Sequence, residues 1–109
     1  MSLRLPKPVT TYLAAVDAKG TDMLALCFAE DAVVHDEGRD YRGLEIIKSW
    51  MQETRAKYQY VVEPLDASVH GRTVILRAEL TGNFPGSPIV LRYTFTLTND
   101  DKITALEIQ

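Results

Sequence analysis

The spacing of hydrophobic residues changes near the middle of the chain. In the first half the spacing is i, i+3, i+4, i+7, which gathers side chains on one face of a helix. It predicts a first helix that begins near Pro8, a short second helix that ends near Glu30, and a third helix over about residues 44–57. The first helix carries this spacing at Val9, Tyr12, Leu13 and Val16. The inward positions expected in the second helix are Met23, Leu24, Leu26 and Cys27.

In the second half, apolar and polar residues alternate, as they do along a β-strand whose two faces differ. The alternation predicts strands at residues 58–69, 73–81, 89–97 and 103–108. Pro64 interrupts the earliest of these, and we expect it at an edge or a bulge because proline cannot donate a hydrogen bond to the ladder. Pro85 and Gly86 have the chemistry of a type II turn between two strands.

Helices followed by strands are typical of an α+β domain. The chain of 109 residues suits one domain, residues 1–109, in which three N-terminal helices wrap a cone-shaped, curved, antiparallel or mixed sheet. Deep positions inside such a cone pack as core, whereas shallower positions can line a cavity. Polar side chains on an otherwise apolar inward face therefore mark the expected cavity.

Composition narrows the range of partners. The chain has 15 acidic and 12 basic residues, and its basic residues are scattered, so we expect no nucleic-acid partner. No segment approaches the roughly 20 apolar residues that span a bilayer, and the N-terminus lacks the apolar core of a secretory signal. These features predict a soluble, cytoplasmic protein without a membrane partner. The single cysteine, Cys27, is expected to be buried and unreactive.

Three ionisable residues, His35, Asp36 and Glu37, directly follow the apolar run that begins at Ala32. If this run is a strand, Asp36 shares the face of Ala32 and Val34, whereas His35 and Glu37 face the other way. A carboxylate on an apolar face is partly desolvated, which raises its pKa and strengthens it as a base. The alternative is that Asp36 begins a turn and caps a nearby backbone N–H group.

Aromatic residues supply the other candidate contacts of a cavity. Tyr12 lies on the apolar face of the first helix, and its phenol needs a partner if it is buried. Trp50 and the strand residues Tyr93 and Phe95 form an aromatic set that suits a flat apolar ligand, and ordinary core packing explains them equally well. The side chains that we expect to contact a ligand are Trp50, Phe95, Val34 and Phe28.

A metal site is a further alternative, built from His35, Glu37 and His70. No HxH, HxxxH or HExxH spacing supports it, so we expect neither a metal nor a cofactor.

The segment TYLAAVDAKGTDMLALCFAEDAVVHDEG, from Thr11 to Gly38, resembles the opening of the nuclear-transport-factor-2-like (NTF2-like) superfamily. The similarity is to its ketosteroid isomerase and SnoaL-like polyketide cyclase branches, and it includes an Arg-Gly pair, Arg42 and Gly43, before the third helix. It implies an NTF2-like or cystatin-like α+β roll. The same fold hosts isomerases, cyclases, hydrolases, dehydratases and binding modules.

The resemblance also implies residue roles. Tyr12 matches the tyrosine with which the isomerases stabilise a dienolate oxygen, and Asp36 matches their general base. Tyr93 stands where the isomerases have a second oxyanion donor, a protonated aspartate, and a phenol can donate the same kind of hydrogen bond. A cofactor-free enzyme that transfers protons on a small apolar carbonyl compound is therefore one prediction, with Asp36, Tyr12 and Tyr93 as its catalytic residues.

Two other functions remain open at this point. The cavity could hold an apolar metabolite without catalysis. The protein could instead bind a protein partner, with an exposed Phe84 as an anchor. The resemblance further implies a homodimer through the sheet, which fits the polar outward residues Arg77, Glu79 and Arg92.

Overall fold

The computed structural model describes residues 4–18 and 20–109. Its three helices are α1 (Lys7–Asp17), α2 (Leu24–Cys27) and α3 (Leu44–Tyr58). Its six strands are β1 (Phe28–Asp36), β2 (Arg39–Arg42), β3 (Val61–His70), β4 (Thr73–Thr81), β5 (Ile89–Leu97) and β6 (Ile103–Ile108). Helices come first and most of the strands follow, so the fold is α+β as predicted.

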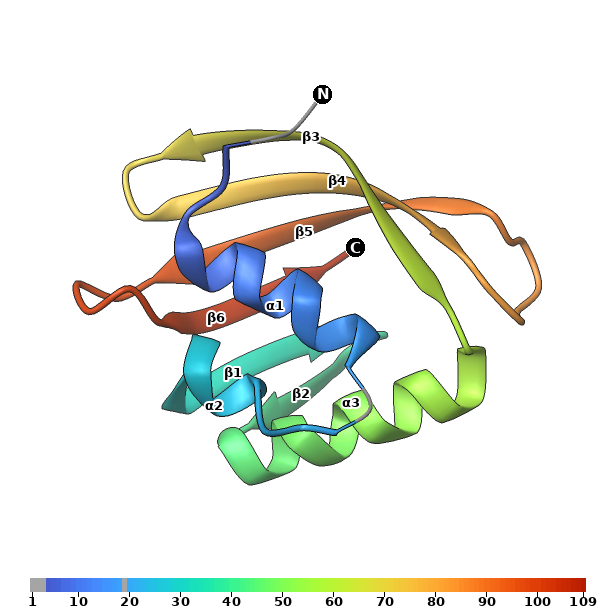
Figure 1. Cartoon of the computed structure of the whole chain (residues 1–109), viewed down its shortest axis with the longest axis horizontal. Coiled ribbons are helices and arrows are strands. Elements are labelled where there is room, and N and C mark those ends of the chain that lie inside the picture. Colours follow the sequence, from blue (N-terminus) through green and yellow to red (C-terminus); the bar gives the residue numbers. More distant parts are fainter. Residues whose placement is uncertain (1–3, 19) are drawn as a thin grey trace.

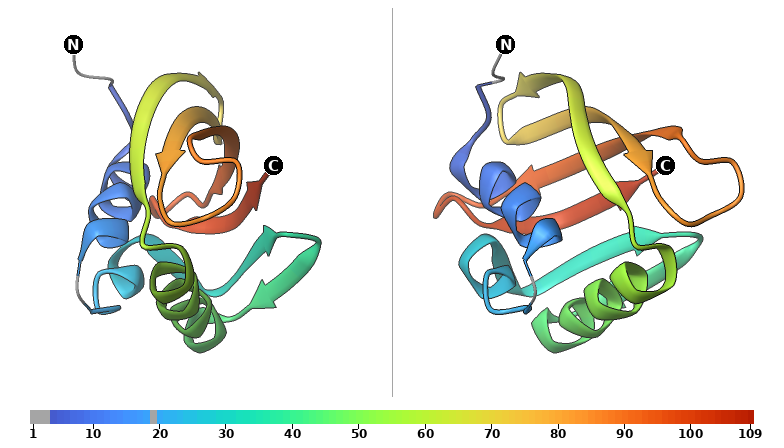
Figure 2. Two further views of the ribbon diagram at one scale, coloured as in Figure 1. Left: turned by 90° about the vertical axis from the view of Figure 1, so that its right-hand side faces the viewer. Right: turned by 45° about the vertical axis from the view of Figure 1, so that its right-hand side comes forward.

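The six strands form one sheet in the order β2-β1-β6-β5-β4-β3. All neighbouring pairs are antiparallel except β1 and β6, which run parallel, so the sheet is mixed. The sheet is strongly curved, and β3 bends over the helical side (Figure 1, Figure 2). Its concave face is thereby turned toward the helices, which is the arrangement that can enclose a cavity.

The helices cover the concave face of the sheet. Helix α1 lies across the middle of this face, whereas α3 packs on β1 and β2 at the other end (Figure 1). The core between the helices and the sheet is built from the side chains that point inward from both. Along β4 and β5 these buried residues alternate with more exposed ones. Its largest fully buried side chains include Tyr12, Phe28, Phe95, Leu24, Ile47, Met51, Leu76, Ile103 and Leu106.

The sequence predicted most elements with small errors at their ends. The bounds of β4, β5 and β6 agree with the alternation, and α1 and α3 agree with the helical spacing. Pro64 lies on the edge strand β3, where the register shifts between Pro64 and Asp66. The turn at Pro85 and Gly86 is also confirmed, because Gly86 has a φ of 88° and the Ser87 N–H group donates to the Phe84 carbonyl.

The prediction for the second helix was wrong. Helix α2 ends at Cys27 because the extended strand β1 begins at Phe28, and Leu26, expected inward, is 65% exposed. In addition, β2 was not predicted from the sequence, and it follows β1 and pairs with it in a hairpin. A strand of four residues with the sequence Arg-Asp-Tyr-Arg carries too little alternation to be recognised from sequence.

No helix among residues 4–18 and 20–109 is long and apolar enough to cross a membrane.

Candidate functional site

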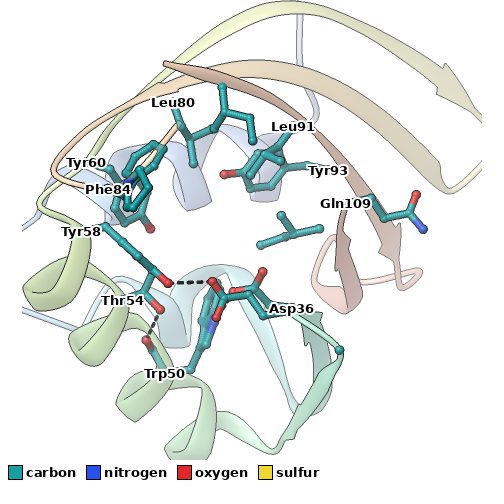
Figure 3. A pocket seen from close by; sticks show the side chains of 15 residues that line it. Asp36, Trp50, Thr54, Tyr58, Tyr60, Leu80, Phe84, Leu91, Tyr93 and Gln109 are labelled. Atoms are coloured by element: carbon teal, nitrogen blue, oxygen red, sulfur yellow. Dashed lines mark hydrogen bonds between the residues drawn. The ribbon is translucent and has the colours of Figure 1, made fainter. Parts of the chain in front are cut away.

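A cavity of about 550 Å³ opens between α3 and the concave face of the sheet, at the end where β1 and β2 meet (Figure 3). This volume lies within the range of small-molecule sites, about 300–1,000 Å³. Its walls are mostly apolar and aromatic, with few polar groups. The side chains and backbone that line it belong to Asp36, Glu37, Gly38, Trp50, Thr54, Tyr58, Tyr60, Leu80, Phe84, Pro85, Ile89, Leu91, Tyr93, Ile108 and Gln109.

Asp36 places a carboxylate at this cavity. It is the last residue of β1, and the alternation that buries Ala32 and Val34 continues to it, as the sequence predicted. Its Oδ2 atom accepts a hydrogen bond of 3.0 Å from the indole Nε1 of Trp50 on α3. Burial raises the pKa of Asp36 above its ordinary value, and the Trp50 hydrogen bond opposes that rise without cancelling it. The carboxylate is thus a stronger base than an exposed aspartate and is held in a fixed orientation.

Two phenols face the same cavity from the sheet side. Tyr93 comes from β5, and Tyr60 from the short connection between α3 and β3 (Figure 3). Burial raises the pKa of Tyr60 to about 12, and the charge of Asp36 adds to the rise. Burial also raises the pKa of Tyr93, and the nearby Tyr60 and Asp36 contribute in the same direction. Both phenols therefore stay protonated at neutral pH and can donate hydrogen bonds.

Tyr12 lies deeper, in the core behind the cavity. Only 1% of it is exposed, and its ring packs against those of Phe28, Tyr93 and Phe95 at centroid distances of 5.9, 6.2 and 5.4 Å. Burial raises its pKa, and Tyr93, Tyr60 and Asp36 add to the rise. Tyr12 itself is not a lining residue.

The expected ligand contacts divide into two groups. Trp50 lines the cavity. Phe28, Val34 and Phe95 do not line it, and they are packed in the core. Their side chains point inward, as the sequence predicted. At these positions, however, the space in front of them is filled by other side chains of the core.

The predicted orientation of Glu37 was wrong. Strand alternation places it opposite Asp36, but β1 ends at Asp36 and Glu37 adopts a φ of 53° in the turn that follows. Its side chain thereby reaches the cavity, where Oε1 accepts a hydrogen bond of 2.8 Å from the Tyr58 hydroxyl. The cavity therefore has two carboxylates.

Phe84 was expected to be exposed, and it is half-buried. Its ring meets that of Tyr58 edge-on, at a centroid distance of 5.8 Å, and lines the cavity. The backbone nearby is tightly packed: the Asn83 N–H group donates to the Tyr58 carbonyl at 2.7 Å, and a Cβ atom at Gly82 would lie 2.8 Å from backbone atoms of Tyr58 and Tyr60. The loop after β4 thus fixes the rim.

The remaining ionisable candidates lie apart from the cavity. His35 is bonded through Nδ1 to the Asp40 carboxylate on β2, and His70 contacts the Ser68 hydroxyl at the far end of β3. Within the described part of the chain, no three His, Cys, Asp or Glu side chains are arranged to hold a metal ion. Cys27 is buried, and burial raises the pKa of its thiol to about 12, so it is a poor nucleophile.

Sequence reasoning missed Tyr60, Tyr58 and Glu37 as cavity residues. Tyr58 and Tyr60 flank Gln59, which has a φ of 44° and ends α3, so neither the helical nor the strand period applies to them. Their shared signal is the concentration of tyrosines at a helix-to-strand connection next to the mouth of the predicted cone. For Glu37 the signal is the following Gly38, which marks a tight turn at which alternation stops.

The chain is similar in sequence and fold to known proteins. The model of the SnoaL-like domain matches residues 9–106. A "putative polyketide cyclase" from Sinorhizobium meliloti is 42% identical, with a TM-score of 0.92 over 96% of this chain and 95% of that one. A protein of ketosteroid isomerase-like fold from Catenulispora acidiphila, solved in complex with trimethylamine, is 25% identical, with a TM-score of 0.83 over 97% of this chain and 86% of that one.

No curated protein matches the chain. The family model spans most of its length, and the S. meliloti structure agrees with it in both sequence and fold. The chain belongs to the SnoaL-like domain family of the NTF2-like superfamily.

Proposed function

We propose that this protein is a cofactor-free enzyme that transfers a proton on a small, largely apolar carbonyl compound. The observation that supports this most is the meeting of one desolvated carboxylate, Asp36, with the phenols of Tyr93 and Tyr60 at an apolar cavity. An enolisation needs a base beside the acidic C–H group and hydrogen-bond donors at the carbonyl oxygen. Both kinds of group are available here within one cavity.

In this mechanism Asp36 removes a proton from the carbon next to the carbonyl group and returns it either to the same carbon or, in a β,γ-unsaturated ketone, to the γ carbon. Its raised pKa brings its basicity closer to what proton transfer at neutral pH requires. The carbonyl oxygen, on which negative charge develops, accepts hydrogen bonds from Tyr93 and from one further phenol. Tyr12 is the second donor that the family resemblance implies, and Tyr60 is the second donor that lines the cavity.

The test follows α-proton exchange of cyclic ketones and β,γ-unsaturated ketones in D₂O by NMR. The native protein should accelerate exchange or double-bond migration for some members of the panel. Asp36→Asn should slow that reaction by about 10²–10⁴-fold, the usual contribution of a positioned base. Asp31→Asn, which removes an exposed carboxylate of β1, is the matched control. Equal rates for the native protein and Asp36→Asn would exclude Asp36 as the base.

A non-catalytic binding role is the second candidate. The structure of the C. acidiphila protein of similar fold in complex with trimethylamine supports small-molecule binding. Native mass spectrometry of gently purified protein separates the two functions. A retained ligand that leaves chemically unchanged favours binding, whereas turnover of a ketone that depends on Asp36 favours catalysis.

We also propose a homodimer that forms through the outer face of the sheet. This face carries polar side chains such as Arg77, whose guanidinium is bonded to Asp66 on β3, and the exposed apolar residues of these strands include Val61 and Val90. A mixed surface of this kind suits a subunit interface. Light scattering coupled to size exclusion should give twice the 12.2 kDa mass of the chain, and a mass of one chain at micromolar concentration would contradict the dimer.

A further inference from the structure

The hairpin turn between β1 and β2 holds a negative charge at the rim of the cavity. Glu37 and Gly38 both have positive φ angles, 53° and 75°, which suit glycine but are unfavourable for a residue with a Cβ atom. The hydrogen bond from the Tyr58 hydroxyl to the Glu37 carboxylate fixes the side chain in this orientation. An asparagine would fit the turn more easily, so backbone preference does not explain a glutamate here.

The charge of Glu37 has no counterpart inside the cavity. Among the described residues that line it, Asp36 and Glu37 are ionisable acids, and there is no lysine, arginine or histidine. Two basic residues of α3 lie nearby, and both are outside the lining. Arg55 donates to the carbonyl groups at the end of α1 and at Gly20, whereas the exposed ammonium of Lys57 lies over the Tyr58 ring and interacts with the charge of Glu37 from the solvent side. An organic anion inside the cavity would therefore meet two negative charges and no basic lining residue.

The walls near Glu37 favour a cation. The Tyr58 hydroxyl is bonded to the carboxylate, and the Phe84 ring packs edge to face against the Tyr58 ring. Trp50, Tyr60 and Tyr93 continue the aromatic lining inward (Figure 3). Ring faces attract ammonium groups. The ammonium of Lys57 already lies 5.0 Å from the centroid of the Tyr58 ring, which illustrates the attraction at this position.

We propose that the ligand of this cavity carries a cationic amino group, which binds at the rim beside the Glu37 carboxylate and the Tyr58 ring. The apolar remainder of the ligand extends inward toward Tyr93. The inner end of the ligand rests on the proposed function, in which its carbonyl group lies beside Asp36. The cationic outer end is inferred from the residues of the rim and does not depend on that function.

Three probes that share a phenol ring test the charge preference: 3-hydroxyphenyltrimethylammonium, 3-tert-butylphenol and 3-hydroxybenzoate. Dissociation constants are measured by NMR titration near pH 6, where the phenol groups are protonated. The ammonium probe should bind about five- to tenfold more tightly than its neutral isostere, and the carboxylate probe most weakly. Equal or tighter binding of 3-tert-butylphenol, or no binding of the ammonium probe at millimolar concentration, would overturn the proposal.

Glu37→Gln removes the charge and keeps an acceptor for the Tyr58 hydroxyl. It should reduce the preference for the ammonium probe by about threefold or more, with 3-tert-butylphenol bound as before. Glu107→Gln is the matched control, since Glu107 is exposed and strand alternation places it opposite the cavity-lining Ile108. An unchanged preference in Glu37→Gln would contradict the proposal. If this variant does not fold, the three probes on the native protein still decide.

The probes contain no acidic C–H group next to a carbonyl. Charge preference is therefore measured independently of proton transfer. If the proposed enzymatic function is wrong, ketone exchange will not depend on Asp36, while the preference for the ammonium probe remains. If the proposed cationic ligand is wrong, ketone exchange will depend on Asp36, but the ammonium probe will not be preferred.

Discussion

The indole Nε1 of Trp50 and the Oδ2 of Asp36, 14 residues apart in sequence, are joined by a hydrogen bond of 3.0 Å across the gap between α3 and β1. The bond favours the ionised carboxylate and so lowers the pKa of Asp36, whereas burial raises it. These opposing effects give a base that is desolvated and also fixed in direction. The same bond ties the helix to the strand that carries the base.

Trp50→Phe should raise the pKa of Asp36 further, because it removes the donor that stabilises the ionised form and leaves the burial in place. The smaller ring should also lower the free energy of unfolding by about 1–3 kcal/mol, since Trp50 is almost fully buried. A ¹³C NMR titration of the Asp36 carboxyl group measures the pKa, and urea unfolding measures the stability. A lower Asp36 pKa in the variant would contradict this account of the bond.

Asp36 should make the folded protein less stable as the pH rises. Its folded-state pKa lies above the unfolded value, so the folded state binds the proton more tightly than the unfolded state does. The stabilising effect is fully present below the unfolded pKa, and it is lost as the pH rises through the folded pKa. Asp36→Asn should therefore gain stability relative to the native protein as the pH rises from the unfolded pKa, about 4, through the higher folded pKa.

Urea unfolding of both proteins at several pH values checks this prediction. Asp31→Asn is the control, because it removes an exposed carboxylate from the same strand. A difference between Asp36→Asn and the native protein that stays constant over this range, or that falls, would show that burial of Asp36 does not perturb its titration.

The sequence predicted the fold because its two hydrophobic periods are long and uninterrupted. Alternation over nine residues in β4 and in β5, and helical spacing over α3, leave one consistent way to bury the apolar side chains. The same logic placed Asp36 correctly, as the continuation of Ala32 and Val34. Short elements failed: α2 has four residues and β2 has four, too few for either period to be read.

The candidate site was predicted only in part, because several of its residues lie where periodicity ends. Glu37 and Gln59 both have positive φ angles, and each reverses the direction of the chain beside the cavity. Alternation carried past such a residue assigns the wrong face, as happened for Glu37. The depth of a residue below the cavity was the second difficulty. Phe95 and Tyr93 share a strand face, yet only Tyr93 reaches the cavity. The depth depends on the curvature of the sheet, which the hydrophobic pattern does not encode.

Tyr93→Phe should separate function from stability. Removing one oxyanion donor typically lowers turnover by about 10²–10³-fold, so ketone exchange should fall by that factor. The free energy of unfolding should stay the same or rise, because the variant no longer buries a hydroxyl group in a side chain that is 2% exposed. Tyr41→Phe, outside the lining, should leave exchange unchanged. Exchange at the native rate in Tyr93→Phe would remove this residue from the mechanism.

Gly82→Ala should destabilise the protein and disturb the cavity rim together. The added Cβ atom would lie 2.8 Å from the Tyr58 carbonyl oxygen and from the Cα and Cβ atoms of Tyr60. Backbone atoms cannot rotate away, so the connection between α3 and β3 must shift, at a cost of about 1–3 kcal/mol in the free energy of unfolding. Gly20→Ala is the matched control, since its Cβ atom would meet no atom within 4 Å. Urea unfolding compares the variants, and equal stability of the two would mean that the contact at Gly82 is relieved without displacing Tyr58 or Tyr60.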